Sequence, residues 1–206
     1  FSTNGVLRQI EEIWSLSASD LGSLTNSVQF GFIIGTLFFT ITGFADKFKP
    51  SRIVTLCCFL GATSNTLIVF EEISFTFVIF SRLVVGVALA GIYPIGMKLI
   101  ISWDPQKAPN TLGLLVGMLV LGSSLPYLIR ALGISLDWQY TVILTSGLCY
   151  IAGITIYLMG DGPHLITNRK SHFRLLDQFS ELLKNKKYLA SAVGYFGHMW
   201  ELYAFW

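Results

Sequence analysis

Three ionisable side chains lie inside apolar stretches of the sequence, where a charge is costly. Arg82 lies between FTFVIFS and LVVGVALAG, and His198 and Glu201 lie within GYFGHMWELYAFW. An Arg in the middle of a membrane helix costs at least ~2.5 kcal/mol unless it is paired or hydrated, so such a residue is functional by default. His198 and Glu201 are spaced i, i+3, which places them on one face of a helix. These two titratable groups suggest a proton relay or a substrate contact, whereas Arg82 keeps its positive charge.

Alternatives exist for each of these residues. Arg82 could be structural, paired with a carbonyl or with a residue of a first helix that is missing from the sequence. A His-x-x-Glu pair could bind a metal, but the sequence offers no further ligands for it. Three cysteines also lie in apolar runs, and we interpret them as small buried hydrophobic residues rather than as a disulfide or metal framework: Cys57, Cys58 and Cys149.

A further polar pattern lies in the stretch 24–45. Its polar side chains fall on one helical face and either bond to another helix or line a water-filled cavity: Asn26, Gln29, Thr36 and Thr40. Gly31 and Gly35 fall on a different face, and their spacing predicts a close contact with another helix.

The elements that must position these residues are membrane helices. The chain has 206 residues, of which 53% are hydrophobic and 13% charged, with a mean hydropathy of +0.63. A typical soluble domain has about 25% charged residues, so a soluble helical core is the weaker interpretation. Apolar runs of ~20 residues can cross a bilayer as helices, and the sequence predicts spans over 24–45, 53–70, 75–103 and 111–130, with a last one ending near Met159.

The basic residues indicate the orientation of these spans. Most Lys and Arg residues fall in the segments 47–52, 107 and 169–187, which alternate with acidic or neutral segments. The positive-inside rule therefore places the loop 42–52 in the cytoplasm and the segments 71–74 and 133–138 outside. Once these residues are assigned to membrane orientation, no basic face remains for nucleic acid, which we exclude as a partner.

The loop 42–52 resembles the signature between the second and third helices of the major facilitator superfamily, Gly-x-Leu-Ala-Asp-Arg-x-Gly-Arg-Arg. The residues that match in place are Ala45, Asp46 and the base Lys47. The remaining positions depart from the signature: Thr42 and Lys49 stand at the two glycines, Pro50 and Ser51 at the basic pair, and Arg52 is one position late.

The sequence from Arg82 to Ala88 resembles the fourth-helix pattern of the same family, Arg-x-x-x-Gly-x-Gly/Ala, with Gly86 in place. The resemblance implies an all-α integral membrane bundle with five complete transmembrane helices, the end of helix one and the start of helix seven. We thus expect an N-terminal bundle over 1–159, a cytoplasmic linker with an amphipathic helix over 160–187, and the start of a C-terminal bundle over 188–206. Most of the first helix would be missing, so the chain would be a fragment.

The function implied by the resemblance is secondary active transport of a small solute by alternating access, coupled to protons. The residues expected to contact the solute or couple protons are Arg82, Tyr93, His198, Glu201, Asn26 and Gln29, and those expected to form a gating loop are Asp46, Lys47 and Arg52. The implied partners are the lipid bilayer, the solute and protons, without a cofactor or metal, in the bacterial inner (plasma) membrane.

Two other classes remain open at this point. One is a membrane sensor or receptor built on a transporter-like scaffold. The other is an enzyme on the same scaffold. The sequence has no nucleophile and base at useful spacing, which counts against an enzyme.

Overall fold

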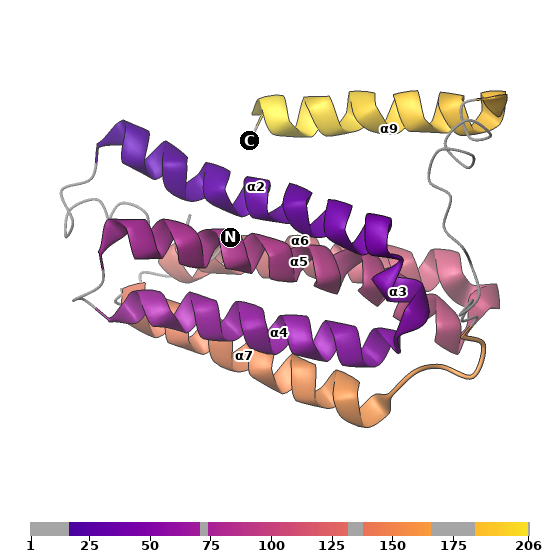
Figure 1. Cartoon of the computed structure of the whole chain (residues 1–206), viewed down its shortest axis with the longest axis horizontal. Coiled ribbons are helices and arrows are strands. Elements are labelled where there is room, and N and C mark those ends of the chain that lie inside the picture. Colours follow the sequence, from indigo (N-terminus) through magenta and orange to yellow (C-terminus); the bar gives the residue numbers. More distant parts are fainter. Residues whose placement is uncertain (1–16, 71–73, 132–137, 166–183, 206) are drawn as a thin grey trace. The chain divides into compact units, whose positions relative to one another are not determined.

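The structure is a computed structural model that describes residues 17–70, 74–131, 138–165 and 184–205 (Figure 1). These residues form helices joined by short connections and contain no strand. The elements are α2 (Ala18–Thr42), α3 (Phe44–Lys47), α4 (Pro50–Thr66) with the 3-10 turn Leu67–Val69, α5 (Phe75–Trp103), the 3-10 turn Pro105–Lys107, α6 (Ala108–Ala131), α7 (Trp138–Met159) and α9 (Lys186–Phe205). The predicted all-α class is confirmed.

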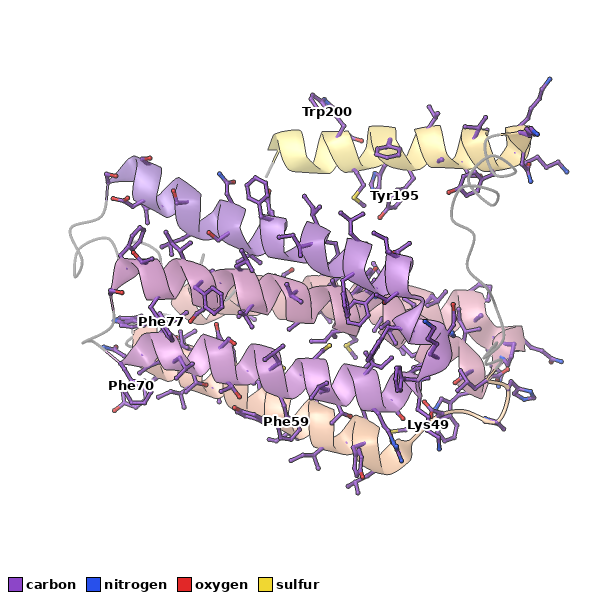
Figure 2. The ribbon with its side chains drawn as sticks, viewed as in Figure 1. Lys49, Phe59, Phe70, Phe77, Tyr195 and Trp200 are labelled. Carbon is purple, nitrogen blue, oxygen red and sulfur yellow. The ribbon has the colours of Figure 1, made fainter. Side chains whose placement is uncertain are left out.

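Among the described residues, four helices are long and apolar enough to cross a membrane: Ser19–Thr42, Pro50–Val69, Phe75–Trp103 and Trp138–Met159. The helix α6 lies at the remaining predicted span, 111–130. Large apolar side chains point outward from these helices, as Phe59, Phe70 and Phe77 do in Figure 2. Such a surface would associate in water, whereas in a bilayer it contacts lipid. The chain is therefore an integral membrane protein.

The chain divides into two compact units, Phe1–Arg169 and Lys170–Trp206. In the first unit α2 packs on α5, α5 on α4, and α4 on α7, while α6 lies against α5. The division falls inside the predicted linker 160–187, and the assignment of linker and second bundle stays a prediction. The predicted amphipathic helix lies almost entirely in 166–183, and the predicted end of helix one lies in 1–13; both are outside the described residues.

Local chemistry explains where α2 begins and ends. The Ser17 side chain accepts a hydrogen bond from the Asp20 amide at 3.3 Å, and the Asp20 carboxylate accepts one from the Ser17 amide at 3.0 Å. This reciprocal cap satisfies amides at the start of the helix. At the other end Gly43 has a φ of 59°, a left-handed conformation that favours glycine. The helix therefore ends at Thr42, before the predicted end at 45.

Glycines allow α2 and α5 to lie in direct backbone contact. A Cβ on Gly31 would lie 2.0 Å from the carbonyl oxygen of Leu83, and one on Gly86 would lie 2.1 Å from the carbonyl oxygen of Val28. A Cβ on Gly35 would come within 2.8 Å of the Ala90 Cβ. The predicted close contact at Gly31 and Gly35 is confirmed, and its partner is the helix that carries Arg82.

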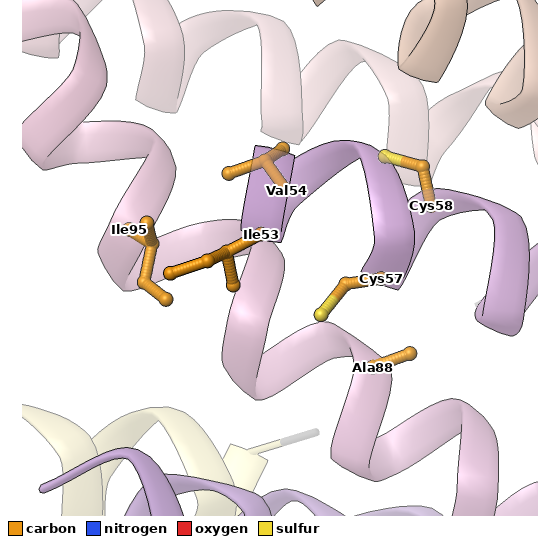
Figure 3. Packing of buried hydrophobic residues seen from close by; sticks show 6 residues of the cluster. All are labelled: Ile53, Val54, Cys57, Cys58, Ala88 and Ile95. Carbon is orange, nitrogen blue, oxygen red and sulfur yellow. The ribbon is translucent and has the colours of Figure 1, made fainter. Parts of the chain in front are cut away.

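Two apolar clusters fill the first unit. We call the end of the bundle that carries α3 and residues 160–165 the inner end. The inner cluster joins α4 and α5 through Ile53, Val54, Cys57, Cys58, Ala88 and Ile95 (Figure 3). The outer cluster joins α2, α4, α5 and α7 through Leu24, Ile68, Val78, Trp138 and Val142. Cys57 and Cys58 are thus buried apolar residues with free thiols, as expected.

Candidate functional site

Arg82 is the most deeply buried charged side chain that the described residues contain, with 4% of its surface exposed. One of its terminal nitrogens, Nη2, donates a hydrogen bond to Oδ1 of Asn65 on α4 at 2.7 Å. The Asn65 amide nitrogen in turn donates to Oγ of Ser146 on α7 at 2.9 Å. We call these three residues the Arg82 cluster. It links α5, α4 and α7 through their side chains.

The Arg82 cluster lies between the two apolar clusters on each of its helices. On α4, Asn65 comes after Cys58 and before Ile68, and on α5 Arg82 lies between Val78 and Ala88. Hydrogen bonds are electrostatically stronger in such a low-dielectric layer than in water, and an unsatisfied buried group there costs about 1–3 kcal/mol. In this layer the Arg82 guanidinium is therefore oriented by its hydrogen bond to Asn65.

The interface between α4 and α7 supports this layer with further polar contacts. The hydroxyls of Thr63 and Tyr150 are 2.7 Å apart, and the Thr55 hydroxyl donates to the carbonyl of Gly153 at 3.1 Å. A Cβ on Gly153 would lie 3.0 Å from the Cys58 Cβ, so the helices are close at this point. These contacts hold α4 against α7 beside the Arg82 cluster.

The sequence analysis missed Asn65 and Ser146. Asn65 carried a signal, because it is the only amide side chain in the apolar run 53–70 and polar residues inside spans usually face protein. Ser146 carried none, since serine is common in membrane helices.

The predicted polar face of α2 is largely exposed in the described part of the first unit, with Thr36 half-buried. Asn26, Gln29 and Thr40 are exposed, and within the described residues neither Asn26 nor Gln29 makes a side-chain hydrogen bond to another helix. Both interpretations of this face, hydrogen bonding to another helix and cavity lining, stay predictions. Tyr93 on α5 is half-buried. The roles of these residues in contacting a solute stay predictions.

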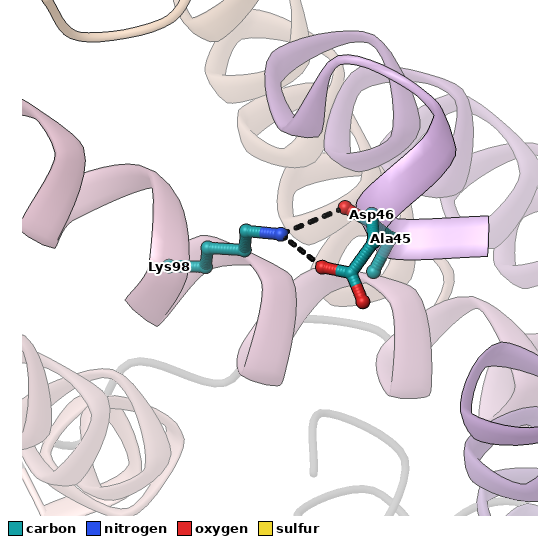
Figure 4. Close-up of polar contacts among 3 residues, drawn as sticks. All are labelled: Ala45, Asp46 and Lys98. Carbon is teal, nitrogen blue, oxygen red and sulfur yellow. Dashed lines mark hydrogen bonds and ion pairs between the residues drawn. The ribbon is translucent and has the colours of Figure 1, made fainter. Parts of the chain in front are cut away.

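At the inner end, Asp46 pairs with Lys98. The Lys98 ammonium lies 2.5 Å from Oδ1 of Asp46 and donates to the carbonyl of Ala45 at 3.0 Å (Figure 4). Lys98 thus joins α5 to the loop. Lys47 donates to the carbonyl of Thr42 at 2.8 Å, and Arg52 is exposed at the start of α4. The gating role of Asp46, Lys47 and Arg52 stays a prediction.

A second inner-end contact comes from the segment after α7. Asp161 accepts a hydrogen bond at 2.8 Å from the amide of Ser51, in the first turn of α4. The side chain of Lys49, the residue before the helix, does not cap this end. Ser102, near the end of α5, accepts one from the Gly162 amide at 3.0 Å. The sequence analysis placed this segment only in the predicted linker 160–187. The structure shows that this segment also joins α4 to α5.

His198 and Glu201 lie on α9, in the second unit, and both are exposed there. Asn185 precedes the helix, and its side-chain oxygen accepts from the amides of Lys187 and Tyr188 at 3.1 and 3.3 Å. His198 and Glu201 are three residues apart on this continuous helix, so their two titratable side chains lie on the same face. Their predicted role in proton transfer remains a prediction.

Comparison with known families gives one match. The profile described as Major Facilitator Superfamily matches residues 1–206. No curated protein sequence matches the chain.

Proposed function

Because the chain belongs to the Major Facilitator Superfamily, a family of membrane transporters rather than enzymes, we propose that the intact protein is a secondary active transporter. It carries a small solute by alternating access and couples that movement to protons. Two helical bundles rocking about a site near the middle of the membrane would expose the solute to one side at a time.

The observation that carries this proposal is the burial of Arg82 within the membrane layer. Arg82 donates to the neutral amide of Asn65, which in turn donates to Ser146, so this chain of hydrogen bonds orients the guanidinium. A positive charge held in a low-dielectric layer attracts an anionic group strongly. Arg82 is thus suited to bind a carboxylate or phosphate of the solute, or a carboxylate of the protein.

Proton coupling needs a second kind of group, one whose charge changes. We assign this role to Glu201, assisted by His198, because both can gain and lose a proton while Arg82 cannot. Asn26, Gln29 and Tyr93 supply neutral polar contacts to the solute. The exposure of Asn26 and Gln29 supports this role, since a polar face that avoids its own bundle favours a water-filled cavity.

The gating loop in this proposal contains Asp46, Lys47 and Arg52. The ion pair between Asp46 and Lys98 supports it, because it holds the loop against the inner end of α5. Closing and opening of the inner side would then move the loop together with the helix that carries Arg82. The location we propose is the bacterial inner (plasma) membrane.

Transport by the intact protein in proteoliposomes tests the proposal. A panel of labelled small anions, cations and neutral solutes would be offered with a pH gradient imposed or collapsed by a protonophore, with protein-free liposomes as the control. We expect accumulation of at least one solute that depends on the gradient. Accumulation insensitive to the protonophore would contradict proton coupling, and no protein-dependent movement of any solute would favour a sensor.

A further inference from the structure

The amide of Asn65 is matched to both of its neighbours in the Arg82 cluster. Its oxygen faces the guanidinium, which carries only donors, and its nitrogen faces the Ser146 hydroxyl, which can accept. Reversing the amide would place two donors against each other at Arg82. Asn65 therefore has one favourable orientation, which the guanidinium sets, and the Ser146 hydroxyl accepts from the amide nitrogen in that orientation.

The contact directs Arg82 toward α4 and α7. Gly86, one turn further along α5, faces α2 instead, since a Cβ there would lie 2.1 Å from the Val28 carbonyl oxygen. The Arg82 guanidinium thus lies on the side of the bundle where α4 packs on α7, and the exposed polar residues Asn26 and Gln29 belong to a different helix. The bond to Asn65 thus helps to place the charge on this side of α5.

We propose that Asn65 is a positioning residue for Arg82, and that its amide competes with the anionic group that the guanidinium binds during transport. A bond between two charged groups is stronger than a bond from a charged donor to a neutral amide. An anion in the cavity therefore draws the guanidinium away, and the amide takes it back when the anion leaves. The competing anion rests on the proposed function, whereas the placement by Asn65 rests on the contacts alone.

Chemical labelling of Arg82 tests the placement without any solute. Phenylglyoxal modifies accessible guanidinium groups, and mass spectrometry of the intact protein in membranes gives the rate at which the Arg82 peptide is modified. We expect Asn65→Leu to raise this rate about fivefold or more, because a bond to a charged group is lost. Asn65→Asp should lower the rate below that of the unsubstituted protein, since a carboxylate holds the guanidinium more strongly.

Thr63→Val is the matched control. It removes a polar contact between α4 and α7, that with Tyr150, without touching the Arg82 cluster, and it should leave the rate unchanged. Equal labelling of the unsubstituted protein and of Asn65→Leu, whether strong or absent, overturns the proposal. A rise in the labelling rate of Thr63→Val equal to that of Asn65→Leu also overturns it. If Asn65→Leu does not fold, labelling of Asn65→Asp equal to that of the unsubstituted protein overturns it. Because labelling needs no solute, failure of proton-coupled transport would leave these outcomes unaffected.

Discussion

At the scale of single residues, the type of charge separates Arg82 from Glu201. Arg82 stays positive over the accessible pH range, whereas Glu201 can be neutralised by a proton. We expect Glu201→Gln in the intact protein to abolish proton-driven accumulation and to spare exchange of solute across the membrane. Arg82→Ala should abolish both, because the fixed charge is lost. Gradient-driven uptake and counterflow in proteoliposomes measure the two activities, and undiminished pH-dependent uptake by Glu201→Gln would refute the assignment.

The pair of Asp46 and Lys98 gives a second residue-scale prediction. Both side chains are partly exposed, and such pairs contribute at most ~1 kcal/mol to stability. Asp46→Asn should therefore leave membrane insertion and thermal stability nearly unchanged but reduce transport, because the loop is no longer held to α5. Lys98→Gln should have the same effect.

Asp104→Asn serves as the control for this pair. Its ion pair with Lys107 is 3.6 Å long and highly exposed, and it joins neighbouring residues rather than a loop and a helix. We expect normal transport from this variant. Normal transport by Asp46→Asn as well would show that the loop does not gate.

At the scale of elements, the contact between α2 and α5 depends on a missing side chain at Gly86. Gly86→Ala should destabilise the protein by about 1–3 kcal/mol, the usual cost of overpacking, because its Cβ would meet the Val28 carbonyl oxygen at 2.1 Å. Gly117→Ala on α6 is the matched control, since nothing lies within 4 Å of its added Cβ. Thermal unfolding in detergent compares them, and equal stability of both variants would contradict the predicted contact.

The segment after α7 gives another prediction at this scale. Asp161→Ala should lower stability by about 1 kcal/mol, because the Ser51 amide in the first turn of α4 loses its acceptor and a negative charge leaves the helix N-terminus. Asp161→Asn keeps an acceptor oxygen and should lose less. Thermal unfolding measures the stability of both variants. A larger loss of stability in Asp161→Asn than in Asp161→Ala would argue against the capping role.

At the scale of the whole molecule, the alternation of charge predicts its orientation. The structure brings α3, Lys98 and the segment 160–165 to one end of the first unit, which supports a common side for these loops. In a background without the natural cysteines, Lys49→Cys should react with an impermeant thiol reagent only from the cytoplasm. Ser74→Cys should react only from outside. Both positions are exposed, and labelling of the Lys49 position from outside would overturn the orientation.

The sequence by itself determined the membrane class, the approximate spans and the glycine contact. These depend on hydropathy and on residues within one or two turns, which are readable along the chain. The predicted end of α2 was less accurate, because the left-handed backbone of Gly43 ends the helix inside the apolar run.

Only the tertiary structure decided which side chains surround the candidate site. Arg82 and Asn65 lie 17 residues apart, Asn65 and Ser146 lie 81 apart, and Ser51 and Asp161 lie 110 apart. Hydropathy identifies a helix as apolar but does not give its rotation or its neighbours. The rotation and the neighbours of each helix follow from side-chain packing between α4, α5 and α7, which places Asn65 against the buried Arg82.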